Sequence, residues 1–329
     1  MKIVVGASTP ETISERIDVG ADEVFCGYIP EYWLDEFQFF MSPGRRWGPM
    51  SSMTNLDGLN AAVAAAHDLG KKFSLTLNAQ NITKGQLAVI ERLIEELKTT
   101  DVDHLIVSDI ALLRVLRRTW RDIPIHLSTG GTVFNANSAA FFQDLGVNRI
   151  IFPRALKLTD AYDIADAYPE MEFEIFTSHS RCLNIDGFCY FEHMIVYMSN
   201  EAPPFMNFSM CNIDYDIGVL SAQSLSAAES ARIRQNMQQK WRFSSNPKTC
   251  RACDMFDCAN HNIRYLKIPG RDCNSADKRT MMQQEISFLR RLTDSLDTFP
   301  NSSAYQSFAQ DQFHQTFREK CTLHGPYCL

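Results

Sequence analysis

The chain has 329 residues, of which 45% are hydrophobic and 22% are charged, and its formal net charge at pH 7 is −7. This composition is that of a globular protein with room for one barrel of about 250 residues plus additions, or for two ordinary domains. The acidic balance argues against a broadly basic surface for nucleic acid. No window approaches the roughly eighteen apolar residues of a membrane span, and the N-terminus MKIVVGASTP lacks the apolar core of a signal peptide, so a cytoplasmic location is expected.

Eight short runs rich in β-branched residues are predicted to form strands. They are Lys2–Ala7, Glu23–Gly27, Lys72–Asn78, His104–Asp109, Ile125–Thr129, Arg149–Arg154, Glu172–Ser178 and Tyr265–Gly270. Most of the intervals carry apolar residues at helical spacing, at residues 55–70, 84–100, 111–120, 135–146 and 157–168. These strands are too apolar for one face to be exposed to solvent. Because they alternate with helices, they predict a parallel sheet that is covered by helices. Eight such units predict a (β/α)8 TIM-like barrel of the α/β class.

Two segments are longer than a simple connection requires. Residues 28–56 form an aromatic, Gly- and Pro-punctuated stretch after the second strand, and residues 179–264 separate the seventh strand from the eighth. Both follow the C-terminal ends of strands, the face on which such barrels carry their active sites. The predicted organisation is a barrel over residues 1–273 that includes the cysteine-rich insertion 179–264, followed by a closing helix and C-terminal tail over residues 274–329.

Most of the ten cysteines lie within residues 176–273, and without a secretory signal they favour metal binding over disulfides. Four of them, Cys182, Cys189, Cys211 and Cys250, are separated by 6, 21 and 38 intervening residues. Structural zinc sites usually take their ligands as close pairs, so this wider spacing favours an iron–sulfur cluster, with zinc as the alternative. A rival set is Cys250, Cys253, Cys258 and Cys273, and the spacing alone does not choose between the two. Cys26, on the second strand, is expected to be an ordinary buried thiol.

Several motifs in order resemble those of one known family. They are GADEVFCG, SLTLNA, LIVSDIALLRVLRR, IPIHLSTGGTVFN, GVNRIIFPRALKLTDAYDIA, FTSHSRCLNIDGFC and YLKIPGR, which together span about residues 3–273. They resemble the corresponding runs of the collagenase-like peptidase family U32, especially its short UbiU- and UbiV-type members. This chain departs from the family's motifs where it has Gly130 in place of Gln, and Ala155 and Pro269 in place of Glu.

The resemblance implies an oxygen-independent hydroxylase that holds a [4Fe–4S] cluster on four cysteines. Members of the family look like enzymes that act on an rRNA cytidine, a tRNA uridine or the ubiquinone ring, with prephenate implicated as hydroxyl donor. The family's cysteine ligands fall on Cys182, Cys189, Cys211 and Cys250, which favours this set over its rival. Peptidase activity is not expected, because no nucleophile motif is present and most of the thiols would be idle.

Side chains at the C-terminal ends of the predicted strands are the candidate catalytic residues. Arg154 and Arg271 are expected to clamp the carboxylates of a small acidic donor, because guanidinium groups bind carboxylates through two hydrogen bonds. His126 is a candidate acid or base, and Lys267 is expected to face the barrel interior. Asn78 and Asp109 are expected to form hydrogen bonds and cap loops, with contact to substrate as the alternative. Buried or structural roles are the alternatives for the two arginines, His126 and Lys267.

The sequence therefore predicts an anaerobic iron–sulfur hydroxylase of a small aromatic or quinone-precursor substrate, as in ubiquinone biosynthesis, with a prephenate-like carboxylate donor. A related protein subunit, forming a heterodimer, is a further expected partner. RNA-base hydroxylation is an alternative that the acidic charge of −7 makes less expected. A non-catalytic cluster- or zinc-binding assembly subunit and a zinc-stabilised hydrolase are the remaining alternatives.

Overall fold

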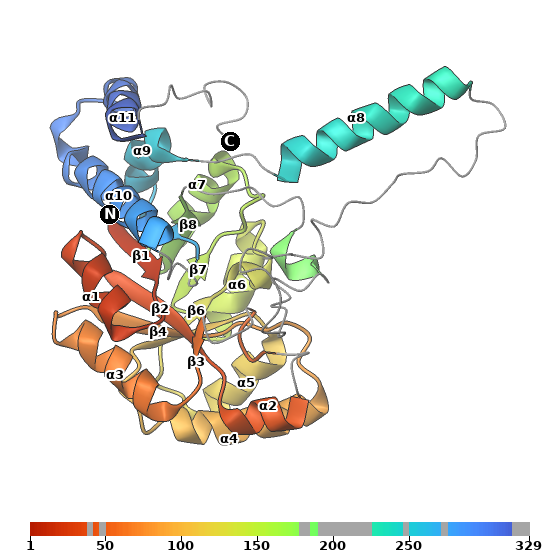
Figure 1. The fold of residues 1–329 in the computed structure, drawn as a ribbon, viewed down its shortest axis with the longest axis vertical. Helices are drawn as coiled ribbons and strands as arrows, with labels where there is room; N and C mark the ends of the chain where they lie inside the picture. Colours follow the sequence, from red (N-terminus) through yellow and green to blue (C-terminus); the bar gives the residue numbers. More distant parts are fainter. Residues whose placement is uncertain are drawn as a thin grey trace.

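The computed structural model describes residues 1–37, 42–45, 51–177, 185–189, 226–245, 250–270 and 276–317. Its strands are β1 (Lys2–Gly6), β2 (Glu23–Tyr28), β3 (Ser52–Met53), β4 (Lys72–Leu77), β5 (His104–Val107), β6 (Ile125–Leu127), β7 (Arg149–Ile151), β8 (Glu172–Phe176) and β9 (Ile263–Ile268). All pairings are parallel, and β1 pairs with both β2 and β9, so that eight strands close a barrel with β3 as a short addition beside β2 (Figure 1). The predicted TIM-like barrel is confirmed.

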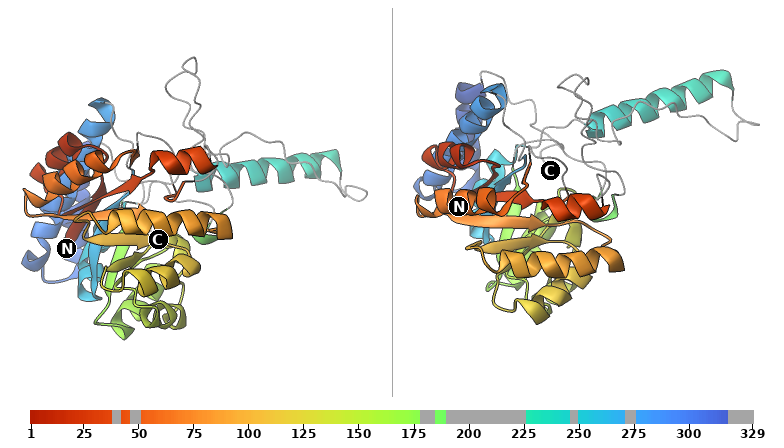
Figure 2. Two further views of the ribbon diagram at one scale, coloured as in Figure 1. Left: turned by 90° about the horizontal axis from the view of Figure 1, so that it is seen from below. Right: turned by 60° about the horizontal axis from the view of Figure 1, so that its bottom comes forward.

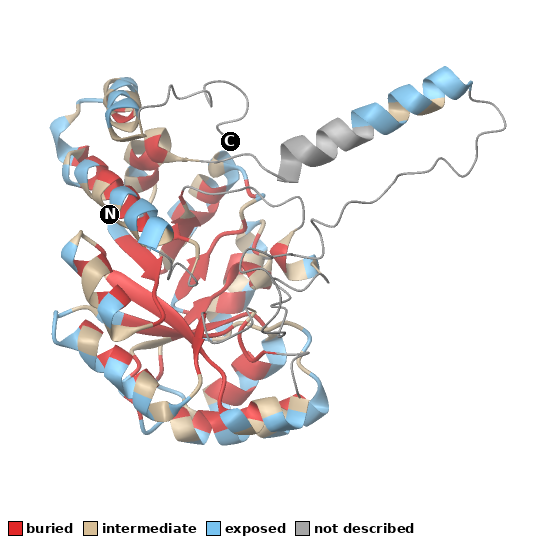
Figure 3. Ribbon diagram, viewed as in Figure 1, coloured by how far each residue is buried: buried red, intermediate tan, exposed pale blue. Residues whose placement is uncertain are grey.

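Helices cover the outside of this barrel. They are α1 (Pro10–Asp18), α3 (Leu56–His67), α4 (Lys84–Leu97), α5 (Ile110–Thr119), α6 (Ala136–Asp144), α7 (Leu158–Ala167) and α10 (Ala276–Asp294). Several begin at a residue whose side chain accepts a backbone N–H of the first turn, such as Asn55, Asp109 and Asn135. The strands are buried, and the helices are buried mainly along the side that faces them (Figure 3). The main hydrophobic core therefore lies between the barrel and its helices.

Some elements are not apparent from the sequence pattern. They are β3, α2 (Glu31–Phe37), α8 (Ala227–Ser245), α9 (Met255–Asn260), α11 (Ser302–Phe317) and the 3-10 helices η1 (Thr129–Gly131), η2 (Asp186–Phe188), η4 (Ala252–Asp254) and η5 (Leu296–Thr298). The helix α2 lies beside α4, where the Tyr32 hydroxyl donates to Glu96 at 2.7 Å (Figure 2). The helix α11 is mostly polar, and Tyr305 and Ala309 are its buried residues. Short or polar elements of this kind give little periodic signal.

The closing helix α10 lies against α1 and β1, as its position after the eighth barrel strand predicted. Arg290 on α10 donates to the Gly20 carbonyl at 2.8 Å and forms an ion pair with Asp22. The predicted boundary between residues 273 and 274 lies outside the described residues and stays a prediction. Among the helices that the structure describes, none has the length and apolarity needed to cross a bilayer.

The interior of the barrel contains buried charges. The Arg149 guanidinium contacts Glu23 Oε2 at 2.7 Å and Glu174 Oε2 at 3.1 Å, and Lys267 Nζ contacts Glu174 Oε1 at 2.8 Å. Burial acts to raise the pKa of Glu174, but Lys267 and Arg149 outweigh it and hold that pKa below its ordinary value. The Arg149 guanidinium also lies 3.4 Å from the centre of the Tyr265 ring. The pair of Arg149 with Glu23 joins β7 to β2 across the barrel, while the pairs of Glu174 join the neighbouring strands β7, β8 and β9.

Two stacked histidines make the stability of this interior depend on pH. The rings of His104 and His126 are 4.4 Å apart, and burial lowers the pKa of both, most strongly that of His126, which Arg149 lowers further. An unfolded chain takes up protons on these rings below about pH 6.5, while the folded protein resists doing so. The free energy of unfolding is therefore expected to fall as pH drops from 7.5 to 5.5, by up to about 2.7 kcal/mol per pH unit for two protons.

Urea unfolding at several pH values measures this slope. The double variant His104→Gln/His126→Gln is expected to lose most of it, because glutamine does not titrate. An equal slope in the variant and the parent protein would assign the pH dependence to other groups.

Candidate active site

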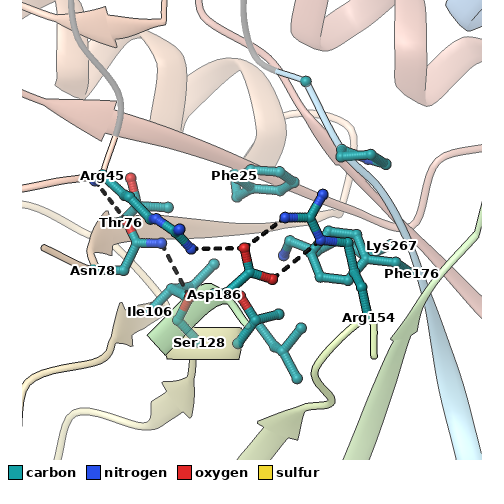
Figure 4. Close-up of a pocket in the computed structure, with 14 residues that line it drawn as sticks. Phe25, Arg45, Thr76, Asn78, Ile106, Ser128, Arg154, Phe176, Asp186 and Lys267 are labelled. Carbon is teal, nitrogen blue, oxygen red and sulfur yellow. Dashed lines mark hydrogen bonds and ion pairs between the residues drawn. The ribbon is translucent and has the colours of Figure 1, made fainter. Parts of the chain in front are cut away.

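A pocket opens at the C-terminal ends of the barrel strands, the face predicted to carry the site. It is lined by Phe25, Arg45, Thr76, Asn78, Ile106, Ser128, Thr129, Ile151, Arg154, Phe176, Asp186, Lys267, Pro269 and Gly270 (Figure 4). Most of these residues end or follow a barrel strand, whereas Arg45 and Asp186 come from the two long segments 28–56 and 179–264. The pocket therefore combines the barrel with both insertions.

The two arginines of the pocket meet on one carboxylate. Arg154 binds Asp186 through two contacts, Nη2 to Oδ1 at 2.5 Å and Nε to Oδ2 at 3.1 Å. Arg45 Nη1 contacts Asp186 Oδ1 at 2.9 Å, and Figure 4 shows the two guanidinium groups reaching the carboxylate from different sides. Among the described residues of this part of the pocket, two cations therefore contact one buried anion.

Neutral polar groups continue the lining beside Arg45. The Asn78 side-chain oxygen accepts the backbone N–H of Arg45 at 3.1 Å, while its Nδ2 donates to Ser128 Oγ at 3.1 Å. This network fixes the orientation of the Asn78 amide and joins the loop at residue 45 to β4 and β6. An oriented amide and a hydroxyl at the ends of strands are suited to hydrogen-bond a polar ligand.

The inner part of the pocket is aromatic and contains one buried ammonium group. Lys267 Nζ lies 3.9 Å from the centre of the Phe25 ring. The same Nζ atom also contacts Glu174. Burial lowers the pKa of Lys267, while Glu174 acts to raise it. Ile106, Ile151 and Phe176 line the pocket nearby. A flat, partly apolar ligand with polar edges matches this combination.

The short helix η2 packs closely against η1 at the mouth of the pocket. A Cβ atom on Gly187 would lie 2.0 Å from Thr132 Cγ2 and 2.6 Å from the Gly130 carbonyl oxygen, so only glycine fits there. A Cβ on Gly130 would in turn lie 2.4 Å from Ser108 Oγ. The glycine found where the family's motif has glutamine therefore matches the close approach of these segments in this chain.

The predicted catalytic residues divide into three groups. Asn78, Arg154 and Lys267 line the pocket together, as the strand-end argument predicted. His126 is buried inside the barrel at 2% exposure and is not among the lining residues, while Asp109 accepts the Leu112 N–H at the N-terminus of α5 and also that of Ile82. The structure therefore places His126 in the buried position that was its alternative, and Asp109 in the capping position that was expected of it. Arg271 lies outside the described residues.

Two of the four predicted cluster ligands are described, and both lie on the pocket side of the barrel. Cys189 follows η2 directly, three residues after Asp186. Cys250 precedes Arg251, whose guanidinium donates to the Leu156 carbonyl in the loop after β7. Cys182 and Cys211 lie outside the described residues. Within the described part of the chain no group of three or more His, Cys, Asp or Glu side chains is arranged to hold a metal ion, and two cysteines of four do not test the predicted set.

The other described cysteines differ in their surroundings. Cys258, a member of the rival set, is fully buried with Sγ 3.8 Å from the Tyr162 hydroxyl, and burial raises its pKa to about 12. Cys26 is also buried, and its Sγ donates to the Ser51 carbonyl at 3.7 Å, which confirms the expectation of an ordinary buried thiol.

The sequence did not single out Arg45, Asp186, Glu174 or Arg149. Asp186 lies between Cys182 and Cys189 in a motif noted for its cysteines alone, and Arg45 lies in the glycine-rich part of a segment noted for its aromatic residues. Arg149 and Glu174 stand on predicted strands, where alternation with apolar neighbours was the available sign that they face the barrel interior.

Comparisons with known proteins identify a family and several relatives. The sequence model of peptidase family U32 matches residues 8–323. The chain is 31% identical over 189 residues to tRNA hydroxylation protein P of Helicobacter pylori, covering 57% of this chain and 42% of that protein. It is 32% identical over 187 residues to the Escherichia coli protein of the same name, covering 56% and 37% of the two chains. A 23S rRNA 5-hydroxycytidine synthase of Escherichia coli is 31% identical over 183 residues, covering 54% and 24%.

The chain spans less than half the length of these curated relatives. Among solved structures, that of the U32 peptidase Mk0906 matches 55% of this chain and 70% of its own at 16% identity, with a TM-score of 0.42.

Proposed function

The chain belongs to peptidase family U32, and from this membership we propose that it hydroxylates a base of tRNA in the pocket at the C-terminal ends of the barrel strands. The observation that carries the proposal is the lining of this pocket, which combines the cations Arg45, Arg154 and Lys267 with the aromatic rings of Phe25 and Phe176. Similarity to proteins named for tRNA hydroxylation and for 5-hydroxycytidine synthesis in ribosomal RNA supports RNA as the substrate class.

This reading corrects two predictions from the sequence. A small aromatic or quinone-precursor substrate was expected, and nucleic acid was considered less probable as a partner, but the relatives are named for RNA modification. The error came from using the net charge of −7 as a property of the whole surface. A substrate meets the local field of its site, and the residues that line this pocket include three cations and one anion.

Within this proposal the residues of the pocket recognise a base that has left its stack. Enzymes that modify a base inside structured RNA need the base turned out of the helix and held by its polar edge and its ring faces. Asn78, Ser128 and Lys267 would hydrogen-bond the polar edge, and the rings of Phe25 and Phe176 would lie against the base. Arg45 and Arg154 would attract the flanking phosphates.

We also propose a [4Fe–4S] cluster on Cys182, Cys189, Cys211 and Cys250, with zinc as the alternative. The described cysteines of this set fit the proposal in one respect, since both stand on the side of the barrel that holds the pocket. Such a cluster, when bound, would supply electron transfer or Lewis-acid binding at an iron. Asp186 would hold the segment that carries Cys189 next to the pocket through its contacts with Arg45 and Arg154.

Deletion of the gene tests the proposed reaction. Nucleosides from purified tRNA and ribosomal RNA of the deletion strain are compared with those of the parent strain by mass spectrometry. A nucleoside 16 mass units heavier than its unmodified form, about one oxygen atom, is expected to disappear from tRNA and to return with the wild-type gene.

Complementation with Arg154→Ala is expected to restore less than about a tenth of this nucleoside, because one truncated charge contact of this kind costs roughly 2 kcal/mol or more. Arg118→Ala serves as the matched control. Arg118 is an exposed arginine on α5, and it pairs with Glu91 of α4. Loss of a hydroxylated nucleoside from ribosomal RNA instead would move the substrate to that RNA. An unchanged set of nucleosides in both RNAs would contradict the proposal.

A further inference from the structure

A large aromatic side chain is exposed beside the pocket. Phe188 ends η2, two residues after Asp186, and 68% of its surface is exposed to solvent. Its backbone N–H donates to the Ile185 carbonyl at 2.9 Å within the turn. Single exposed apolar side chains are common on protein surfaces and need no explanation by themselves. The surroundings of Phe188 are what set it apart.

The turn that carries Phe188 is fixed by contacts of the two residues before it. Asp186 is 4% exposed and is bound by Arg45 and Arg154, while Gly187 packs so closely on η1 that no side chain fits there. The backbone before Phe188 is therefore fixed to the barrel, although its ring is left in solvent. A ring on a fixed backbone loses little conformational freedom when it binds a partner, which makes it an efficient contact.

The charge next to Phe188 indicates what kind of partner would cover it. The cations Arg45 and Arg154 lie in the adjacent pocket, where they outnumber the carboxylate of Asp186. An exposed aromatic ring beside arginines is the combination with which proteins bind unpaired nucleotides, by stacking on the base and neutralising its phosphate.

We propose that Phe188 stacks on an unpaired RNA base adjacent to the one that enters the pocket. The inference rests on the proposed tRNA hydroxylation and adds a second base-recognition position to it, outside the pocket itself. Stacking is tolerant of sequence because every base has a ring face, so Phe188 contributes affinity and orientation, whereas the polar groups of the pocket read the target base.

Binding of RNA by the full-length protein tests this position. The probe is total tRNA from the deletion strain, and its dissociation constant is measured by filter binding. Phe188→Ala is expected to weaken binding by about 5- to 150-fold, the range found for the loss of one stacked base. Phe188→Trp is expected to bind as tightly as the wild type. Phe141→Ala is the matched control, because Phe141 is 48% exposed on α6 and is not among the pocket residues.

A second measurement reports stacking directly. The tryptophan fluorescence of Phe188→Trp, corrected for that of the wild type, is expected to be quenched when tRNA is added, as a stacked indole would be. Both measurements use protein whose metal content equals that of the wild type, so that an effect on neighbouring Cys189 is excluded. Wild-type protein that binds no RNA would contradict the proposed function as well. Wild-type binding that Phe188→Ala leaves unchanged, with no quenching in Phe188→Trp, would contradict this inference alone.

Discussion

Replacing Cys189 or Cys250 with alanine is expected to reduce the iron and sulfide of the anaerobically purified protein from about four of each per chain to nearly none. Cys182→Ala and Cys211→Ala are expected to do the same, because each removes one of the four thiolates proposed to hold the cluster. The broad absorption band near roughly 400 nm would be lost with the iron. Metal analysis and the absorption spectrum of each variant measure the effect.

The controls for this prediction come from thiols that the structure places in the hydrophobic core. Cys258→Ala and Cys26→Ala are expected to keep the full iron content, since both side chains are buried in the hydrophobic core. Cys253→Ala is also expected to keep its cluster. Iron loss in Cys253→Ala or Cys258→Ala, with iron retained in Cys182→Ala, would select the rival set. Stoichiometric zinc in a colourless protein would replace the cluster by a structural metal site.

The barrel was predictable because its signal is local and repeated. Each strand is a short apolar run bounded by turn residues, and the predicted strands begin at the observed residue in seven of the eight cases, the exception being Ile263 rather than Tyr265. Seven of the predicted ends run one to three residues beyond the observed ones, as at Asn78 and Arg154, and the second ends one residue short. Asn78 and Arg154 are among the pocket residues, since the ends of parallel strands lie together.

The partners of these residues could not be predicted, because they are distant in sequence. Arg45 and Asp186 are 141 residues apart, and no local pattern indicates that a loop after β2 meets a turn after β8. His126 shows a related limit. Alternation with Leu127 places its side chain inside the barrel, but it does not tell how deep along the barrel axis the ring lies. Depth separates a buried, neutral histidine from one that could contact substrate.

Asp109 illustrates competition between two roles for one residue type. A carboxylate after a barrel strand is well placed for catalysis, and the same position is the N-cap of the next helix. In this chain the capping role is observed, with Oδ1 accepting the Leu112 N–H at 3.0 Å and Oδ2 accepting the Ile82 N–H at 3.3 Å. A sequence pattern alone gives the same signal for both roles.

Arg149→Met is expected to lower the free energy of unfolding by about 3–5 kcal/mol, the usual cost of removing one partner from a buried ion pair. The Arg149 side chain is 2% exposed and contacts Glu23, Glu172 and Glu174, so its removal takes this cation from buried Glu23 and leaves Glu174 with Lys267. Urea unfolding at pH 7.5 measures the change. Arg118→Met is the matched control, because its exposed pair with Glu91 is expected to contribute about 0–1 kcal/mol.

The same variant has a diagnostic pH dependence. Without Arg149, Glu174 loses one of the two cations that hold its pKa down, so burial raises that pKa relative to the wild type and the ionised carboxylate is less stable inside the folded variant. At a pH below about 4.3, the value for a glutamate in an unfolded chain, this carboxyl group is protonated in both states and the penalty disappears. The difference in unfolding free energy between wild type and Arg149→Met is therefore expected to shrink as pH falls from 7.5 toward about 4.5. A difference below about 1 kcal/mol that stays constant with pH would show that Glu23 and Glu174 are solvated or paired elsewhere, contrary to the network described for the barrel interior.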